Sequence, residues 1–139
     1  MELAQKHNLA LIFHVREAYD DFWPIYDKFS GIRGVLHSFT DNMANLDKAL
    51  ARGLFIGVNG IATFTKETIQ TEVYRAIPIT NLLLETDAPY LTPVPLRGNI
   101  NEPKNTRLVG EYLASLRGET LETISSKTTE NAKQLFKIN

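Results

Sequence analysis

Short apolar runs alternate with segments of helical periodicity along the chain. Each run is continuously apolar, as expected of strands that are buried on both faces of a parallel sheet. Between and after the runs, apolar residues recur at the three- and four-residue spacing of helices that bury one face. The runs are LALIFHV (9–15), GVLHSF (34–39), LFIGVNG (54–60) and NLLLETD (81–87), and the helical segments are 19–29, 42–52, 66–77, 105–117 and 121–138.

The order of these elements predicts an α/β fold with four parallel strands, which are joined by right-handed helical crossovers and followed by two helices. A short helix that ends at Asn8 precedes the first strand. Two details stay open. Pro24 places either a loop or a first helical turn at the start of its segment, and the less regular pattern of 121–138 fits one helix or two short ones. No linker or low-complexity tract divides residues 1–139, which predicts a single domain.

Composition narrows the class of protein and the chemistry that it can perform. Hydrophobic residues make up 43% of the chain and charged residues 22%, which is typical of a soluble globular protein. The net charge of −1 gives no overall basic surface, so any contact with a nucleic acid has to be local. Cysteine is absent, which excludes disulfides and thiolate metal sites and fits a reducing cytoplasm. No apolar run approaches the roughly 18 residues of a membrane span, and the N-terminus lacks the pattern of a signal peptide.

Polar side chains stand at the C-terminal end of every predicted strand. His14, His37 and Asn59 end the first three runs, and Glu85 and Asp87 end the fourth. The C-terminal ends of parallel strands converge on one face of the fold, where functional sites are built. Because two imidazoles and a carboxylate suit zinc, manganese and similar ions, His14, His37 and Asp87 form a candidate metal site. Glu85 shares a strand face with Asp87 and is either structural or a partner that orients a ligand.

Each of these residues also has a purely structural interpretation. A histidine at a strand end is commonly a hydrogen-bonded turn residue, although two at equivalent places in consecutive units favour a shared site. Asp87 and Asn59 are both residue types that form turns. Arg16 fits a solvent-exposed pair with the glutamate that follows it, but beside a metal site it is a candidate phosphate contact.

Several motifs, in their order and spacing, resemble those of the TatD-type deoxyribonucleases, which are metal-dependent hydrolases with an amidohydrolase-like TIM-barrel fold. The resemblance extends over essentially the whole chain, and ETDAPYL together with the downstream NEP is its most specific part. The motifs are HVRE (14–17), HSFT (37–40), GVNG (57–60) with TF (63–64), LLLETDAPYL (82–91) and RGNINEP (97–103).

The resemblance implies a reaction and roles for individual residues. In the family, the histidines that match His14 and His37 bind one divalent ion, and the aspartate that matches Asp87 serves a second ion and the attacking water. The resemblance thus implies Mg²⁺, Mn²⁺ or Zn²⁺ as cofactor, two ions in the complete site, and Asp87 as the catalytic residue. The implied substrate is DNA, single-stranded or at a 3′ end, and the implied reaction is hydrolysis of its phosphodiester bonds.

The loop over 93–103 is the candidate for substrate recognition. It follows Asp87 directly and is expected to cross the same face, where loops commonly carry specificity. Within it, Asn101 and Glu102 are candidate substrate contacts beside Arg16. Ile100 stands where the family usually has an arginine, which removes one candidate phosphate contact.

The chain departs from the family mainly in its length. A (β/α)₈ barrel takes about 250 residues, and the four predicted strands match the last four of the family's eight. The family's N-terminal H-x-H motif and its metal-bridging glutamate have no counterpart here. We therefore expect the C-terminal half of a barrel, with two open sheet edges and an uncovered inner face, which pairs with itself or with an N-terminal half. In addition, Asp41 replaces the usual glycine and adds an acid near the mouth of the site.

Two other functions fit the same residues. A related amidohydrolase would use such strand-end ligands on a small ester or amide, and a substrate panel with added Mg²⁺ or Mn²⁺ separates it from a nuclease. A non-catalytic binding or assembly domain would keep the fold without a complete site, and it would bind metal without turnover.

Overall fold

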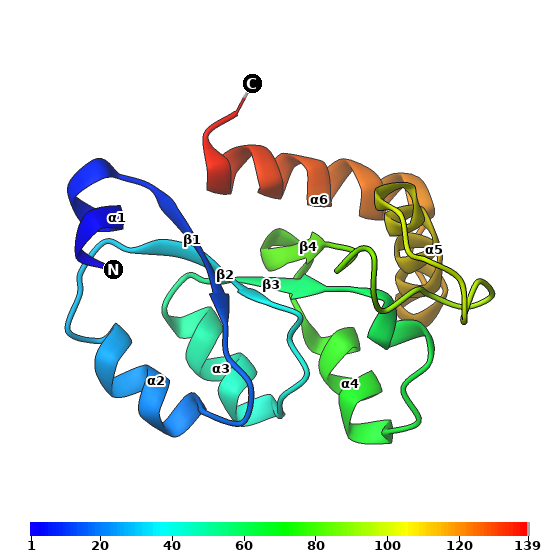
Figure 1. Ribbon diagram of the computed structural model, residues 1–139, viewed down its shortest axis with the longest axis horizontal. Helices are drawn as coiled ribbons and strands as arrows, with labels where there is room; N and C mark the ends of the chain where they lie inside the picture. The colour runs from blue at the N-terminus through cyan, green and yellow to red at the C-terminus, as the bar shows by residue number, and fades with distance from the viewer. Residues whose placement is uncertain (139) are drawn as a thin grey trace.

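Each predicted strand segment contains a strand, and the strands pair in the order in which they occur in the chain. The computed structural model describes residues 1–138, and within them a parallel sheet has the order β1-β2-β3-β4. The helices that join the strands lie on one side of this sheet (Figure 1). The strands are β1 (Ala10–His14), β2 (Arg33–His37), β3 (Phe55–Val58) and β4 (Leu82–Leu84), and the helices are α1 (Glu2–His7), α2 (Tyr19–Tyr26), α3 (Met43–Ala51), α4 (Thr68–Ala76), α5 (Thr106–Arg117) and α6 (Leu121–Phe136). The predicted alternation of four parallel strands with helices is confirmed.

The helix boundaries follow from local capping and from the hydrophobic pattern. Asn42 begins α3, where its side chain accepts a hydrogen bond from the amide of Asn45 at 3.0 Å. Pro24 lies inside α2, so the alternative of a loop at the start of that segment is wrong. Helix α6 is one continuous helix of 16 residues, so the alternative of two short helices is also wrong. Among the described residues, no helix combines the length and the apolar character that crossing a membrane requires.

The larger hydrophobic core lies between the sheet and helices α2 to α5. Alternate residues of β2, β3 and β4 point into it, and Leu36, Ile56 and Leu82 are fully buried there. Leu46 of α3 and Leu113 of α5 belong to the same buried cluster. Because burial of each such side chain contributes about 1.5–3 kcal/mol, this layer holds the strands in place and thereby positions their ends.

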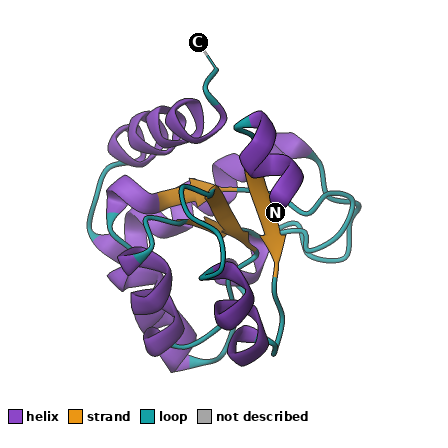
Figure 2. Ribbon diagram, turned by 90° about the vertical axis from the view of Figure 1, so that its left-hand side faces the viewer, coloured by secondary structure: helices purple, strands orange, loops and turns teal. Residues whose placement is uncertain are grey.

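The other face of the sheet is covered by α6 over its N-terminal part. Val35, Phe55 and Leu83 pack there with Leu135 of α6 in a second, smaller cluster. Figure 1 and Figure 2 show the strands lying between this helix on one side and α2, α3 and α4 on the other. The expectation of an uncovered inner face is therefore wrong for the N-terminal ends of the strands.

Hydrogen bonds near the N-terminal ends of the strands attach α6 to the sheet. Asn131 Nδ2 donates hydrogen bonds to Ile79 O at 2.7 Å and to Leu82 O at 2.8 Å. The guanidinium of Arg33, the first residue of β2, donates to Leu135 O. These contacts fix α6 across one end of the sheet and leave the C-terminal strand ends uncovered by it.

Strand β1 is more exposed than its apolar sequence predicts. Ile12 is 62% exposed, and His14 is exposed as well. Only Ala10, at the start of the strand, reaches the cluster beneath α6. The expected burial on both faces is therefore wrong for β1, which is an edge strand in the described part of the chain.

Candidate active site at the strand ends

The C-terminal ends of β1 and β2 bring two histidines side by side. His14 and His37 are register partners in the parallel ladder. Their ring centroids are 5.6 Å apart and the rings are tilted by 37°. Both rings lie on the inner face of the sheet, because the alternation of side chains puts them on the same face as Val35. The structure thus brings the two predicted metal ligands together, with His14 exposed and His37 half-buried.

His37 lies between two carboxylates that follow β4. Its Nδ1 is 3.0 Å from Glu85 Oε2, and its Nε2 is 2.8 Å from Asp87 Oδ1. The hydrogen bond with Glu85 is the main cause that raises the pKa of His37, partial burial opposes it, and the charges of both carboxylates add to the rise. Two of the predicted ligands, His37 and Asp87, are therefore in direct contact.

Asp87 sits in a turn, and Asn59 at the end of β3 connects to it. Asp87 has a left-handed backbone conformation with φ 61°, which aspartate tolerates better than most residues. Asn59 is only 2% exposed; its Nδ2 donates to Ser38 Oγ at 2.8 Å and to Asp87 Oδ2 at 3.4 Å. Its Oδ1 accepts from the amide of Ile61 at 3.0 Å, so Asn59 also forms the turn that its sequence indicates.

The sequence indicated Asn59 as a turn former, and the structure shows that its side chain also links the ends of neighbouring strands. The sequence feature that could have predicted this second role is the position of Asn59 at the end of a strand, equivalent to the positions of His14 and His37. Ser38 had no signal of its own, because a serine after a strand is common in any turn.

The loop that follows Asp87 passes over the C-terminal end of β3, on the face where it was predicted. A Cβ on Gly60 would lie 1.9 Å from Leu91 O and 3.1 Å from Pro93 N, so no side chain fits at this position. Thr63 Oγ1 accepts a hydrogen bond from the amide of Val94 at 2.9 Å. The loop is therefore packed onto the site by its backbone.

Asn101, a predicted substrate contact, is buried within this loop and is 3% exposed. Its Nδ2 donates to Thr86 O at 2.8 Å and to Tyr90 O at 2.7 Å. Its Oδ1 accepts from the amide of Glu102 and from Asn105 Nδ2, both at 2.9 Å. Asn101 thus uses its whole amide group to join the two ends of the loop.

The other two predicted substrate contacts have exposed side chains. Arg16 lies just beyond the end of β1, and Glu102 forms an ion pair with Lys104. Asp41, which was expected near the mouth of the site, is engaged at the start of α3. Its Oδ1 accepts from Asn45 Nδ2 at 2.7 Å and from the following backbone amide at 2.8 Å.

The donor chemistry of the cluster suits a divalent ion, but the cluster is not a complete site. An imidazole whose Nδ1 is hydrogen-bonded to a carboxylate is a common arrangement for a metal ligand that binds through Nε2. Within residues 1–138, however, no three His, Cys, Asp or Glu side chains are arranged to hold an ion. The metal-binding roles of His14, His37 and Asp87 stay predictions.

Comparison with known proteins relates the whole chain to one family. The family model of TatD related DNases matches residues 1–137. The uncharacterized metal-dependent hydrolase YabD of Bacillus subtilis (strain 168) is 39% identical over 99% of this chain and 54% of the relative. The 3'-5' ssDNA/RNA exonuclease TatD of Pantoea vagans (strain C9-1) is 33% identical over 99% of this chain and 56% of the relative. The chain spans about half the length of the curated relatives that it matches.

A solved structure leads to the same conclusion about the fold. The crystal structure of YJJV, a TatD homolog from Escherichia coli K12, superimposes with a TM-score of 0.90 and 27% sequence identity. The match covers 99% of this chain and 54% of that one. The predicted fold class, half of a TatD-type TIM barrel, is confirmed.

Proposed function

Because this chain belongs to the TatD related DNase family, we propose that it carries half of the active site of a metal-dependent nuclease that hydrolyses single-stranded DNA from a 3′ end. The observation that carries the proposal is the position of His37, which lies beside His14 on the inner face at the strand ends and contacts Asp87. The names of the relatives support the dependence on metal and the direction of hydrolysis. A cytoplasmic location belongs to the same proposal, since a cysteine-free chain needs no oxidising compartment.

In this proposal, His14 and His37 bind a divalent ion, Mg²⁺, Mn²⁺ or Zn²⁺, and Asp87 serves a second one. When bound, such ions polarise a phosphoryl oxygen and lower the pKa of a bound water. Asp87 orients the attacking water and accepts its proton. Arg16 donates hydrogen bonds to a phosphate oxygen. Its side chain is exposed, so it can turn toward the substrate without breaking a buried contact.

The contacts of the 93–103 loop divide its two candidate residues between different roles. Asn101 keeps the loop in place through its buried hydrogen bonds and does not reach the substrate in this proposal. Glu102 has an exposed carboxylate on the surface of the same loop and contacts the substrate. This division gives the loop a rigid base and an exposed recognition surface.

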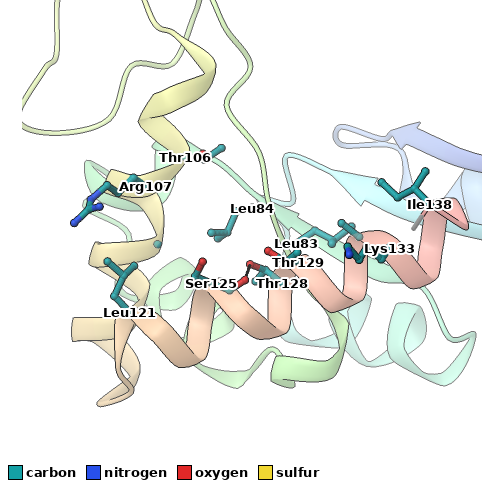
Figure 3. Close-up of a pocket in the computed structure, with 12 residues that line it drawn as sticks. Leu83, Leu84, Thr106, Arg107, Leu121, Ser125, Thr128, Thr129, Lys133 and Ile138 are labelled. Carbon is teal, nitrogen blue, oxygen red and sulfur yellow. Dashed lines mark hydrogen bonds between the residues drawn. The ribbon is translucent and has the colours of Figure 1, made fainter.

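The free edge of β4 borders a groove that a further strand would fill. The amide of Glu85 donates to Val58 O of β3 at 3.0 Å, and alternate residues of a parallel strand direct their peptide groups to opposite neighbours. The N–H and C=O of Leu84 therefore point away from β3. They face a cavity of about 520 Å³ that is lined by residues of α5 and α6 (Figure 3).

We propose that the other half of the barrel supplies this strand. The relatives are about twice as long as this chain, which leaves another half barrel to be accounted for. On one side of Leu84, Leu82 O accepts from Asn131 Nδ2, and on the other, Thr86 O accepts from Asn101 Nδ2. Hydrogen bonds to the added strand therefore centre on Leu84. The remaining metal ligands come from the same half.

A non-catalytic binding domain is the second candidate function. It is favoured by the lack of a complete metal-holding group within residues 1–138. In that case the half barrel binds a partner or a metal ion but performs no hydrolysis, whatever segment is added to it.

The experiment compares the chain alone with the chain mixed with the segment of the Bacillus relative that it does not match. Hydrolysis of 3′- and 5′-labelled single-stranded DNA is followed with Mn²⁺, and light scattering reports assembly. We expect activity from the 3′ end in the mixture and a loss of activity in a His14→Ala, His37→Ala double variant. His7→Ala, which removes an exposed histidine of α1, is the control and should change nothing. An assembled mixture without hydrolysis would leave the binding domain as the function.

A further inference from the structure

Glu85 is the most closely held carboxylate of the site. Its Oε2 is 3.0 Å from His37 Nδ1, and its Oε1 accepts a hydrogen bond from the amide of Ser38. Within residues 1–138, the carboxylate of Asp87, the other one on His37, has only the longer contact of 3.4 Å from Asn59 Nδ2 besides the histidine. The carboxylate of Glu85 is therefore held by two contacts at the end of β2, and it spans β3 to reach them.

Gly57, in the middle of β3, lies directly beneath this carboxylate. A Cβ on Gly57 would lie 2.5 Å from Glu85 Oε2 and 2.6 Å from both its Cδ and its Oε1. The backbone of Gly57 is not in the left-handed region, because its φ lies outside the range that only glycine adopts readily. The absence of a side chain at this position is thus explained by the space that the carboxylate occupies, and not by the backbone.

In a neutral histidine only one of the two ring nitrogens carries a proton. The hydrogen-bond partners of the two nitrogens decide which one it is. Glu85 and Asp87 compete for this proton from opposite sides of the His37 ring. The Asp87 contact is the shorter of the two, at 2.8 Å against 3.0 Å, but the carboxylate of Glu85 is also oriented toward Nδ1 by the backbone amide of Ser38, which favours Glu85. A proton on Nδ1 leaves the lone pair of Nε2 available to a cation.

We propose that Glu85 is a positioning residue that holds His37 in the Nδ1–H tautomer and presents Nε2 to the metal ion, with Gly57 providing the space for its carboxylate. The inference rests on the proposed function for its metal, but the tautomer is a property of this chain without metal or substrate. Glu85 does not touch the reacting atoms. It acts through the orientation of His37.

The test is the ring ¹⁵N spectrum of His37 in the metal-free chain, recorded at alkaline pH where the imidazole is neutral. We expect the Nδ1–H tautomer in the parent chain. Glu85→Ala and Gly57→Ala should both shift His37 toward the Nε2–H tautomer, because Asp87 Oδ1 would then accept the hydrogen bond from Nε2. Glu72→Ala, at an exposed glutamate of α4, is the matched control and should leave the spectrum unchanged. Gly57→Ala removes no polar group, so its effect arises from displacement of the carboxylate alone.

A second readout uses the chain assembled with the other half of the barrel. There, Glu85→Ala and Gly57→Ala should weaken the binding of Zn²⁺ alone about 10- to 100-fold, as expected when the hydrogen-bond partner of a ligating histidine is lost. An Nε2–H tautomer in the parent chain, or an unchanged tautomer in both variants, would overturn the proposal even if the assembly proved to be an active nuclease. The expected tautomer in an assembly without nuclease activity would uphold the role of Glu85 while the proposed function failed.

Discussion

Replacement of Asn101 by alanine tests whether this residue holds the structure or contacts the substrate. The substitution removes the four hydrogen bonds of a side chain that is 3% exposed. At a net value of about 1 kcal/mol each, their loss amounts to about 4 kcal/mol. Tyr90 and Glu102 are exposed, so water can replace part of what their peptide groups lose. We expect a decrease of about 3 kcal/mol in the free energy of unfolding, which is large beside the 5–15 kcal/mol of a typical domain.

The measurement is urea unfolding followed by circular dichroism, for the parent chain, Asn101→Ala and Asn99→Ala. Asn99 is an exposed residue of the same loop whose side chain makes one hydrogen bond, to Leu96 O at 3.0 Å, so its variant should lose less than about 1 kcal/mol. Equal stability of the two variants would refute the structural role of Asn101. In that event, a loss of nuclease activity in Asn101→Ala would support the predicted role of Asn101 as a substrate contact.

Three further results are expected. Gly60→Ala should cost about 2 kcal/mol or more in thermal unfolding experiments, because its Cβ would meet the rigid backbone at Leu91 O; a stable variant would show that the loop can move away. Leu135→Ala should lower the free energy of unfolding by about 2–5 kcal/mol in urea, whereas Phe136→Ala, at an exposed position, should cost much less; similar losses would contradict the packing of α6. In the metal-free chain, protonated His37 stabilises the fold because its pKa is raised above the ordinary value of 6.5; the stabilisation is complete below pH 6.5 and is lost as the pH rises through the raised pKa. The melting temperature should therefore fall over that pH range, and His37→Gln should abolish the fall.

In the proposed half-site, the contacts already present affect how a metal ion would bind. The polar residues at the strand ends make hydrogen bonds with one another, so the carboxylates of Asp87 and Glu85 are both in contact with His37 in the described structure. A divalent ion would have to compete with these contacts. Ligands from a second half of the barrel would favour the ion in that competition, which is why assembly and metal binding are expected to be coupled.

Much of the fold could be predicted because its signals are local. The apolar runs and helical spacings identify the elements, and the short connections between them leave parallel pairing in chain order as the simplest arrangement. The position of His14, His37 and Asp87 at the C-terminal ends of strands followed from that topology alone. The roles of Asn101 and Asn59 did not, because a buried asparagine that bonds distant backbone groups has the same local sequence signature as one in an exposed turn.

The sequence by itself determined the order of the elements, the parallel sheet and the family to which the chain belongs, since each depends on residues close together or on motifs in a fixed order. Only the tertiary structure decided that α6 covers the N-terminal part of the inner face, that Glu85 contacts His37, and that Gly57 makes room for this contact. These features join residues from separate elements, such as Leu135 with Val35 and Glu85 with Gly57. Packing between distant segments depends on the shapes and distances that the folded chain creates, and no local pattern encodes them.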